Sequence, residues 1–235
     1  MALLKWQHYS PSFISRRYNR LAVIYPVFEL IFWLPPGIRK KAVNALKLNP
    51  EDNVIEIGCG TGRNLDMLSK AVAPGGKVYG IDVSENMLKK AMELKEKKNL
   101  SNVELICTDA GSYEFPGNIN EVLFSLSYAV MSERKEIISK LWRKLSPGGR
   151  IVIMDAQFPP GILGKIIAPV KPALILFLKA TVIGNPYIRP IEELKEITGS
   201  VEVEETSMKT YFISAALKAW STYPLTSSPA YKLTP

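Results

Sequence analysis

The 235-residue sequence has few of the side chains that form disulfides or bind transition metals, with two cysteines and one histidine. Cys59 and Cys107 show no CxxC or Cys/His spacing, so the sequence predicts neither a disulfide framework nor a zinc site. We therefore expect no metal ligands and a reducing, cytoplasmic compartment. The histidine, His8, lies close to the N-terminus and is not expected to act as a general base.

The sequence also lacks an uninterrupted apolar run of the roughly 20 residues that would span a bilayer. Residues 21–36 and 161–184 are apolar, but prolines, lysines or a glutamate interrupt them, and the first has no cleavage site of a secretory signal. Residues 1–41 carry seven basic side chains and one acid, and residues 158–189 carry four basic side chains and no acid. This pattern predicts either interfacial membrane segments or helices packed on the domain with their lysines extended toward water.

Short apolar strands alternate with helical patterns from residue 53 onward. Strands are expected at residues 53–57, 77–81, 103–107, 121–126 and 150–155, and helices at residues 61–72, 84–97 and 133–145. This alternation predicts a parallel sheet covered by helices on both faces. After a short helix at residues 191–197, strands at 201–207 and 210–217 are joined by a link so short that they must pair antiparallel.

The segment VIEIGCGTGRNL, residues 54–65, follows the first strand into a turn with alternating glycines at Gly58, Gly60 and Gly62. Glycine allows a tight turn and the close approach of a ligand to the backbone. The dinucleotide fingerprint G-x-G-x-x-G does not fit, because the third glycine falls one place early. A purely structural turn is the alternative.

Two acids follow the next two strands. Asp82 ends the second strand, where a carboxylate can accept both hydroxyls of an adenosine ribose, and Asp109 follows the third strand, where it could accept an adenine amine. The alternatives are a helix N-cap for Asp82, although Ser84 is better placed for that role, and a turn-stabilising role for Asp109.

These features together resemble a class I S-adenosylmethionine-dependent methyltransferase over about residues 40–218: the motif E-x-G-x-G-x-G at residues 56–62, the two acids, and LSPGGRIVIMD at residues 145–155. The resemblance implies a doubly wound α/β fold whose seven-stranded, mainly parallel sheet has the order 3-2-1-4-5-7-6, with strand 7 antiparallel. It also implies S-adenosylmethionine as cofactor and S-adenosylhomocysteine as product. The cofactor contacts that it implies are Tyr18, Glu56, Gly58, Cys59, Gly60, Gly62, Asn64, Asp82, Val83, Met87, Asp109, Ala110 and Ser127.

Two stretches resemble lipid-modifying members of this class. RRYNRLAVIYPVFE, residues 16–29, is similar to the Tyr-Asp-x-x-Ala-x-x-Tyr-Asp segment of the ubiquinone/menaquinone group and of soluble phospholipid N-methyltransferases, with Asn19 and Pro26 where Asp is usual. LFSLSYAVMSERKEII, residues 123–138, resembles a run of the bacterial phosphatidylethanolamine N-methyltransferase group. The resemblance implies N-methylation of a phospholipid head-group amine; C-methylation of a polyprenyl quinone precursor or methylation of another small molecule are the alternatives.

Aromatic rings are expected around the transferred methyl group, because they desolvate an amine and favour a methylated ammonium product. An arginine nearby could pair with a lipid phosphate. The residues expected at the substrate are Tyr25 and Tyr128 as catalytic and Tyr187 and Arg189 as substrate-binding. The alternatives are tyrosines at the edge of the core and a surface ion pair of the arginine with Glu192 or Glu193.

We expect a helical amphipathic cap at residues 1–40, a methyltransferase domain at 41–218 with an apolar insertion at about 158–188, and a loosely ordered tail at 219–235. The basic apolar segments predict an anionic membrane surface as partner and a peripheral membrane location. RNA, which the net charge of +8 could suggest, is not favoured, because the basic residues are interleaved with aliphatic ones. No protein partner is predicted, and a scaffold protein without activity is the alternative to an enzyme.

Overall fold

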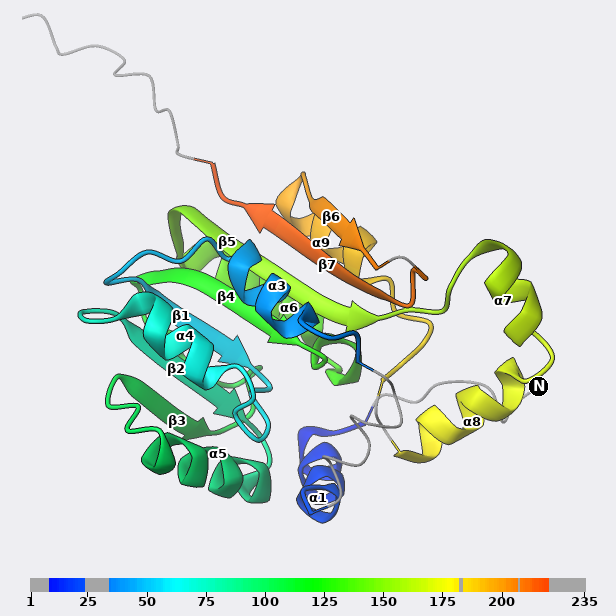
Figure 1. Cartoon of the computed structure of the whole chain (residues 1–235), viewed down its shortest axis with the longest axis horizontal. Helices are drawn as coiled ribbons and strands as arrows, with labels where there is room; N and C mark the ends of the chain where they lie inside the picture. The colour runs from blue at the N-terminus through cyan, green and yellow to red at the C-terminus, as the bar shows by residue number, and fades with distance from the viewer. Residues whose placement is uncertain (1–8, 24–33, 182–183, 207, 220–235) are drawn as a thin grey trace, which may run out of the picture.

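Seven strands form one sheet in the order β3-β2-β1-β4-β5-β7-β6 (Figure 1). The chain is described by a computed structural model for residues 9–23, 34–181, 184–206 and 208–219. Strands β1 to β5 run parallel, and β7 pairs antiparallel with both β5 and β6. The predicted order and the antiparallel seventh strand are confirmed. The strands are β1 (Asn53–Ile57), β2 (Lys77–Asp82), β3 (Val103–Cys107), β4 (Ile119–Ser125), β5 (Leu145–Ala156), β6 (Glu202–Glu205) and β7 (Tyr211–Leu217).

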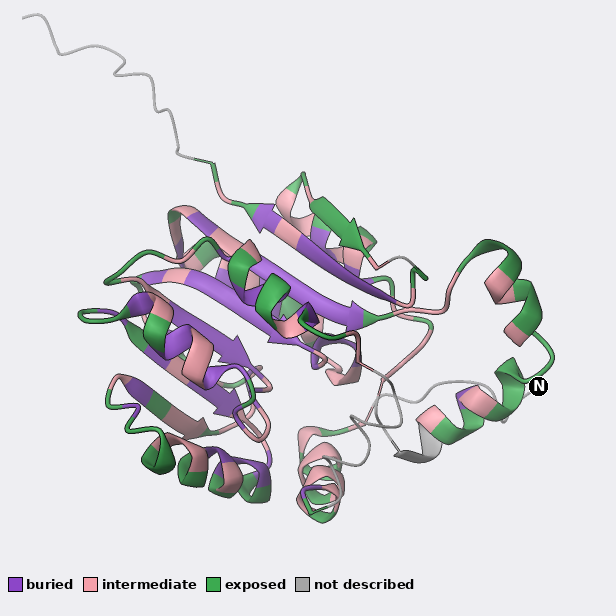
Figure 2. Ribbon diagram, in the orientation of Figure 1, coloured by how far each residue is buried: buried purple, intermediate pink, exposed green. Residues whose placement is uncertain are grey.

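Helices cover both faces of the sheet, so its central strands are buried on both sides (Figure 2). Side chains of α6 and α9 pack with β1, β4 and β7 in one apolar cluster, and side chains of α3, α4 and α5 pack in the cluster on the other face. This two-sided burial is why the strands read as nearly continuous apolar runs. The helices are α1 (Pro11–Leu21), α3 (Ile38–Ala45), α4 (Leu65–Val72), α5 (Glu85–Lys97), α6 (Arg134–Lys144), α7 (Gly161–Ile167), α8 (Lys171–Thr181) and α9 (Pro190–Thr198), with a 3₁₀ turn η2 (Tyr128–Val130).

Two predicted boundaries differ from the structure. Helix α4 begins at Leu65 and not at residue 61, because the glycine turn continues to Gly62, whose φ is +81°. Strand β5 begins at Leu145 and not at residue 150, so it includes the Ser-Pro-Gly-Gly stretch at residues 146–149. Its pairing with β4 is irregular there, because Ile119 pairs with Leu145 whereas Glu121, two residues later, pairs with Arg150. The turn is therefore extra chain within the strand and not a separate connection.

The N-terminal part is only partly a separate cap. Helix α1 lies at the edge of the sheet near α5, whereas α3 packs on the sheet through Ile38, Ala42 and Val43. The boundary expected at residue 40 thus falls inside a helix of the domain. Residues 220–235 of the expected tail lie outside the described residues.

Helices α7 and α8 form the insertion expected at about 158–188, and they extend away from the sheet beyond the end of β5 (Figure 1). Among the described residues, no single helix has the length and apolar character needed to cross a membrane. Taken as a pair, α7 and the first eight residues of α8 meet that test, but their axes bend by 82°.

Candidate functional site

The turn after β1 requires glycine for different reasons at two positions. Gly58 has a φ of +70°, and a Cβ on it would lie 2.5 Å from Cβ of Ser127, so a side chain there would push the turn away from the loop after β4. Gly60 has a φ of +55°, but a Cβ on it would meet nothing within 4 Å. Only the left-handed backbone favours glycine at this second position.

The carboxylate of Asp82 joins this turn to the start of α5. Its Oδ2 accepts a hydrogen bond from the Gly60 N–H and its Oδ1 one from the Ser84 N–H, each at 2.8 Å. Burial raises the pKa of Asp82, and the N–H groups of Ser84 and Gly60 oppose that rise. The cap of α5 is Ser84, whose Oγ accepts from the Met87 N–H at 3.3 Å. The N-cap alternative for Asp82 is therefore wrong.

Glu56 is a buried carboxylate with one oxygen unsatisfied. The Nδ2 of Asn64 donates to Glu56 Oε1 at 2.6 Å, whereas Oε2 has no hydrogen-bond partner among the described residues. Burial raises the pKa of Glu56 to about 7, against the hydrogen bond from Asn64 and the charge of Arg39. An orphaned buried acceptor at a pocket wall favours a ligand with a donor or a positive charge there.

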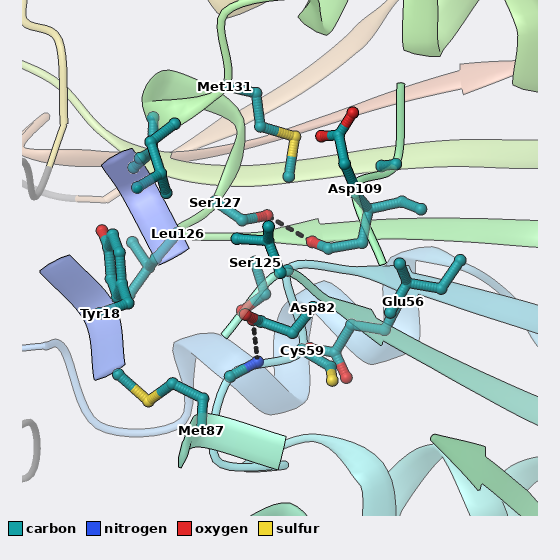
Figure 3. Close-up of a pocket in the computed structure, with 18 of the residues that line it drawn as sticks. Tyr18, Glu56, Cys59, Asp82, Met87, Asp109, Ser125, Leu126, Ser127 and Met131 are labelled. Carbon is teal, nitrogen blue, oxygen red and sulfur yellow. Dashed lines mark hydrogen bonds between the residues drawn. The ribbon is translucent and has the colours of Figure 1, made fainter. Parts of the chain in front are cut away.

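A pocket lies over the carboxyl ends of β1 to β4, and these groups surround it (Figure 3). The expected cofactor-binding residues that line it are Tyr18, Glu56, Gly58, Cys59, Gly60, Asp82, Val83, Met87, Asp109, Ala110 and Ser127. Two expected residues do not line it. Gly62 packs closely against Leu65 and Ala91, and Asn64 donates a hydrogen bond to Glu56. Neither residue faces the pocket; Gly62 shapes the turn, and Asn64 fixes the position of the Glu56 side chain.

Helix α1 closes one side of this pocket with an apolar surface. Tyr9, Pro11, Ile14 and Tyr18 all line it, and of these only Tyr18 was expected. Figure 3 shows Tyr18 and Leu126 on the side opposite Glu56. The Ser-Pro start of α1 and the four-residue spacing of Ile14 and Tyr18 are the signals that could have placed both side chains on one helix face.

Asn19 fastens α1 to α5. Its Oδ1 accepts from the Ser84 hydroxyl at 2.7 Å and from the Asn86 N–H at 3.0 Å, and the Asn86 side chain donates to the Asn19 C=O at 3.0 Å. Asn19 stands where the similar segments usually have Asp, and here it positions the helix and does not line the pocket.

The structure corrects the expectation that Tyr128 lies at the transferred methyl group. Tyr128 is fully buried in the core, where its ring packs edge-on against Phe124 with centroids 5.6 Å apart. Its hydroxyl donates to Glu193 Oε2 at 2.8 Å, and burial together with Glu193 raises its pKa. The edge-of-core alternative is the right one, because η2 turns this ring away from the pocket.

The expected substrate residues of the insertion are also away from the pocket. Tyr187 is 51% exposed, and Arg189 is exposed at the start of α9. Glu193, one of the two alternative partners expected for Arg189, pairs instead with Arg134 at 2.7 Å. Tyr25, the other expected catalytic residue, lies outside the described residues.

Comparison with known proteins identifies the family. Residues 54–149 match a family model described as methyltransferase domain. Demethylmenaquinone methyltransferase of Listeria welshimeri is 29% identical over 147 residues, which are 62% of this chain and 60% of that relative. A solved S-adenosylmethionine-dependent methyltransferase from Aquifex aeolicus matches with a TM-score of 0.56 at 23% identity, covering 89% of this chain and 98% of that one. Residues 54–149 of this chain therefore form a methyltransferase domain, and the chain has the fold of the solved S-adenosylmethionine-dependent methyltransferase.

A second solved structure shares the fold of this methyltransferase. Phosphoethanolamine N-methyltransferase 2 of Haemonchus contortus, in complex with S-adenosylmethionine, matches with a TM-score of 0.59 at 19% identity, covering 77% of this chain and 53% of that one. The methyltransferase thus spans less than two thirds of the Listeria relative's length and about half of the Haemonchus chain.

S-adenosylmethionine fits the pocket; it is bound in the Haemonchus structure, and the Aquifex methyltransferase depends on it. When bound, it supplies a methyl group on a positively charged sulfur. Each oxygen of Asp82 accepts one backbone N–H and so retains a lone pair that would accept a ribose hydroxyl. Oε2 of Glu56 would accept a donor of the amino acid end, and Asp109, which also lines the pocket, would accept the adenine amine.

Alanine at the two turn glycines should separate crowding from backbone strain. Gly60→Ala should lower the free energy of unfolding by about 1 kcal/mol, the cost of a left-handed non-glycine residue. Gly58→Ala adds the clash with Ser127 and should cost roughly 3 kcal/mol. Urea unfolding of both variants measures the difference; equal losses would contradict the crowding at position 58.

The raised pKa of Glu56 predicts a pH-dependent stability of the cofactor-free protein. Its folded-state pKa of about 7 exceeds the ordinary 4.5, so its contribution to stability is fully present below 4.5 and is lost as the pH rises through 7. Glu56→Gln keeps the acceptor for Asn64 and removes the titration. The variant should be more stable than the wild type by roughly 2 kcal/mol near pH 8 and equal to it near pH 4. A difference independent of pH would refute the buried, protonated carboxyl.

Asp82→Ala should weaken S-adenosylmethionine binding by about 2 kcal/mol, roughly thirtyfold in Kd, since charged hydrogen bonds to the ribose are lost. Isothermal titration calorimetry measures this directly. Glu114→Ala is the matched control, because it removes the same charge at a side chain that is 86% exposed. Unchanged affinity in Asp82→Ala, with the fold intact by circular dichroism, contradicts the assignment.

Proposed function

We propose that this methyltransferase methylates the head-group amine of a membrane phospholipid such as phosphatidylethanolamine. The observation that carries the proposal is the aromatic and apolar wall on the α1 side of the pocket. Ile14 and Tyr18 come from α1, Tyr9 from the residues just before it, and Val130 and Met131 from the loop after β4.

This wall suits the two charge states that an amine passes through. A primary amine attacks only when neutral, although its pKa in water is near 10, so the site has to favour the uncharged form. Apolar side chains do so by desolvation, which lowers the pKa of an amine. The methylated ammonium product is favoured by ring faces such as those of Tyr9 and Tyr18. Helix α1, held by Asn19, also keeps water from this side of the pocket.

An amphiphilic acceptor also agrees with the surface next to the pocket. Helices α7 and α8 expose apolar side chains within a stretch that has four basic residues and no acid. Arg189 is exposed at the end of this stretch, and we propose that it pairs with a lipid phosphate outside the pocket.

C-methylation of a polyprenyl quinone precursor is the second candidate. The Listeria demethylmenaquinone methyltransferase, at 29% identity, favours it. That reaction needs a base for the ring proton, and the pocket-lining carboxylate that is not assigned to the cofactor is Glu133. An amine acceptor needs no such base if it binds neutral.

Radiolabelled S-adenosylmethionine should distinguish the two acceptors. The protein is incubated with vesicles containing either phosphatidylethanolamine or demethylmenaquinone, and the extracted lipids are separated. We expect label in N-methylated phospholipid; label in the quinone alone would establish the second candidate instead, and label in neither lipid would refute a lipid acceptor of either kind.

The same assay tests the aromatic wall. Tyr18→Ala should reduce kcat/KM for the phospholipid at least tenfold, because it removes the ring that desolvates the amine. Tyr128→Phe is the matched control: its ring lies in the core, so kcat/KM should stay within about threefold of the wild type. A loss in Tyr128→Phe equal to that in Tyr18→Ala would contradict this division of roles.

A further inference from the structure

Helices α7 and α8 and the turn between them expose several large apolar side chains, although Ile175 of α8 is buried. No side chain of α7 is buried, although its sequence is Gly-Ile-Leu-Gly-Lys-Ile-Ile. Figure 2 shows the pair coloured mostly as exposed or intermediate. The large apolar residues that it exposes, with their exposed fractions, are Ile162 (78%), Ile166 (67%), Val170 (60%), Leu176 (52%) and Phe177 (41%). Five exposed large apolar side chains within one stretch of 16 residues, Ile162 to Phe177, favour an interaction site.

The charge around these side chains has one sign. Residues 158–189 contain four basic side chains and no acid, and Lys165 and Lys171 lie within or at the start of the two helices. The ammonium of Lys171 lies 4.8 Å from the ring centre of Phe158. Apolar side chains bordered by cations complement an anionic lipid surface, in which each cation and each buried methylene adds to binding.

The bend of the pair restricts how it can enter a bilayer. The helices meet at 82°, so they cannot form one straight span. Two short helices at this angle suit the interface between head groups and acyl chains, where the apolar side chains enter and the lysines stay among the phosphates.

The two ends of this insertion hold the same residue of the pocket loop. The Ala129 N–H donates to Oδ2 of Asp155 at 3.1 Å, just before the insertion, and the Ala129 C=O accepts from the Asn185 N–H at 3.0 Å, just after it. The next two residues, Val130 and Met131, line the pocket. The insertion is therefore attached by hydrogen bonds to the loop after β4, whose residues Val130 and Met131 form part of the pocket wall proposed to contact the acceptor (the acceptor wall).

We propose that α7 and α8 dock on one leaflet of an anionic phospholipid bilayer, which brings the acceptor wall at residues 130–131 to the lipid surface. The inference deepens the proposed function by naming the surface that delivers the acceptor. Docking itself requires no methyl transfer, so it can be measured without cofactor or reaction.

Vesicle flotation of the full chain tests the docking surface. We expect the wild type to float with vesicles of phosphatidylcholine and phosphatidylglycerol in equal amounts, and to bind pure phosphatidylcholine vesicles at least tenfold more weakly. The double variant Ile162→Glu with Ile166→Glu should lose at least tenfold of the binding to the anionic vesicles. Because no α7 side chain is buried, its melting temperature should stay near that of the wild type.

A matched control separates position from net charge. Val203→Glu with Met208→Glu adds the same charge at residues that are 45% and 60% exposed on the β6–β7 side. This variant should keep the vesicle binding within about threefold.

Three results would overturn the proposal. They are no flotation of the wild type with anionic vesicles, equal losses in the two double variants, and a wild-type dimer by light scattering that the α7 variant converts to monomer without any vesicle binding. The last result would assign the surface to a second copy of the chain. Loss of flotation with intact lipid methylation would leave the proposed function standing, and the reverse would leave the docking surface standing.

Discussion

The carboxylate of Asp82 is the contact on which the pocket depends, because it fixes two loops that the sheet alone does not hold together. One oxygen holds the glycine turn after β1 through Gly60, and the other holds the start of α5 through Ser84. Ser84 in turn donates to Asn19 and so anchors α1. A chain of three hydrogen bonds thus runs from the glycine turn through Asp82 and Ser84 to Asn19 in the helix that covers the site.

The pocket concentrates negative charge where water is largely excluded. Glu56 is buried and Asp82 is partly buried, each raises the pKa of the Cys59 thiol, and desolvation is the main cause of the raised pKa of all three groups. Such an arrangement is costly without a ligand and favours a positively charged one. The methyl donor carries its positive charge on sulfur, so the electrostatics of the cofactor-free protein already select for it. Binding and proton release at Glu56 are therefore linked.

Most of the fold could be predicted from the sequence because it depends on local patterns. Buried strands separated by helices specify the parallel sheet, and the short link before β7 specifies the antiparallel pair. The same holds for the glycine turn and Asp82, whose roles follow from their positions at strand ends. These positions converge at one edge in any parallel sheet, so no tertiary detail is needed to bring them together.

The acceptor side could not be predicted in the same way. The sequence offers no reason to distinguish Tyr128 from Tyr18, since both are tyrosines expected at the site. In the structure, Tyr128 in η2 lies in the core with its hydroxyl bonded to Glu193, whereas Tyr18 in α1 lines the pocket. That difference depends on contacts between residues far apart in the sequence, such as the hydrogen bonds of Asn19 to Ser84 and Asn86, and these contacts leave no local sequence pattern. The irregular start of β5 was missed for a similar reason, since only pairing with β4 shows that the Pro-Gly-Gly stretch continues the strand.

The two backbone hydrogen bonds of Ala129 bear on how far the α7–α8 insertion can change in sequence. The N–H of Ala129 donates to Asp155, which precedes the α7–α8 insertion, and its C=O accepts from Asn185, which follows the insertion. The backbone of the loop after β4 is therefore held by the two residues that flank α7 and α8. A change in the helices between Asp155 and Asn185 that kept these two hydrogen bonds would therefore keep this attachment of the loop that supplies Val130 and Met131 to the pocket.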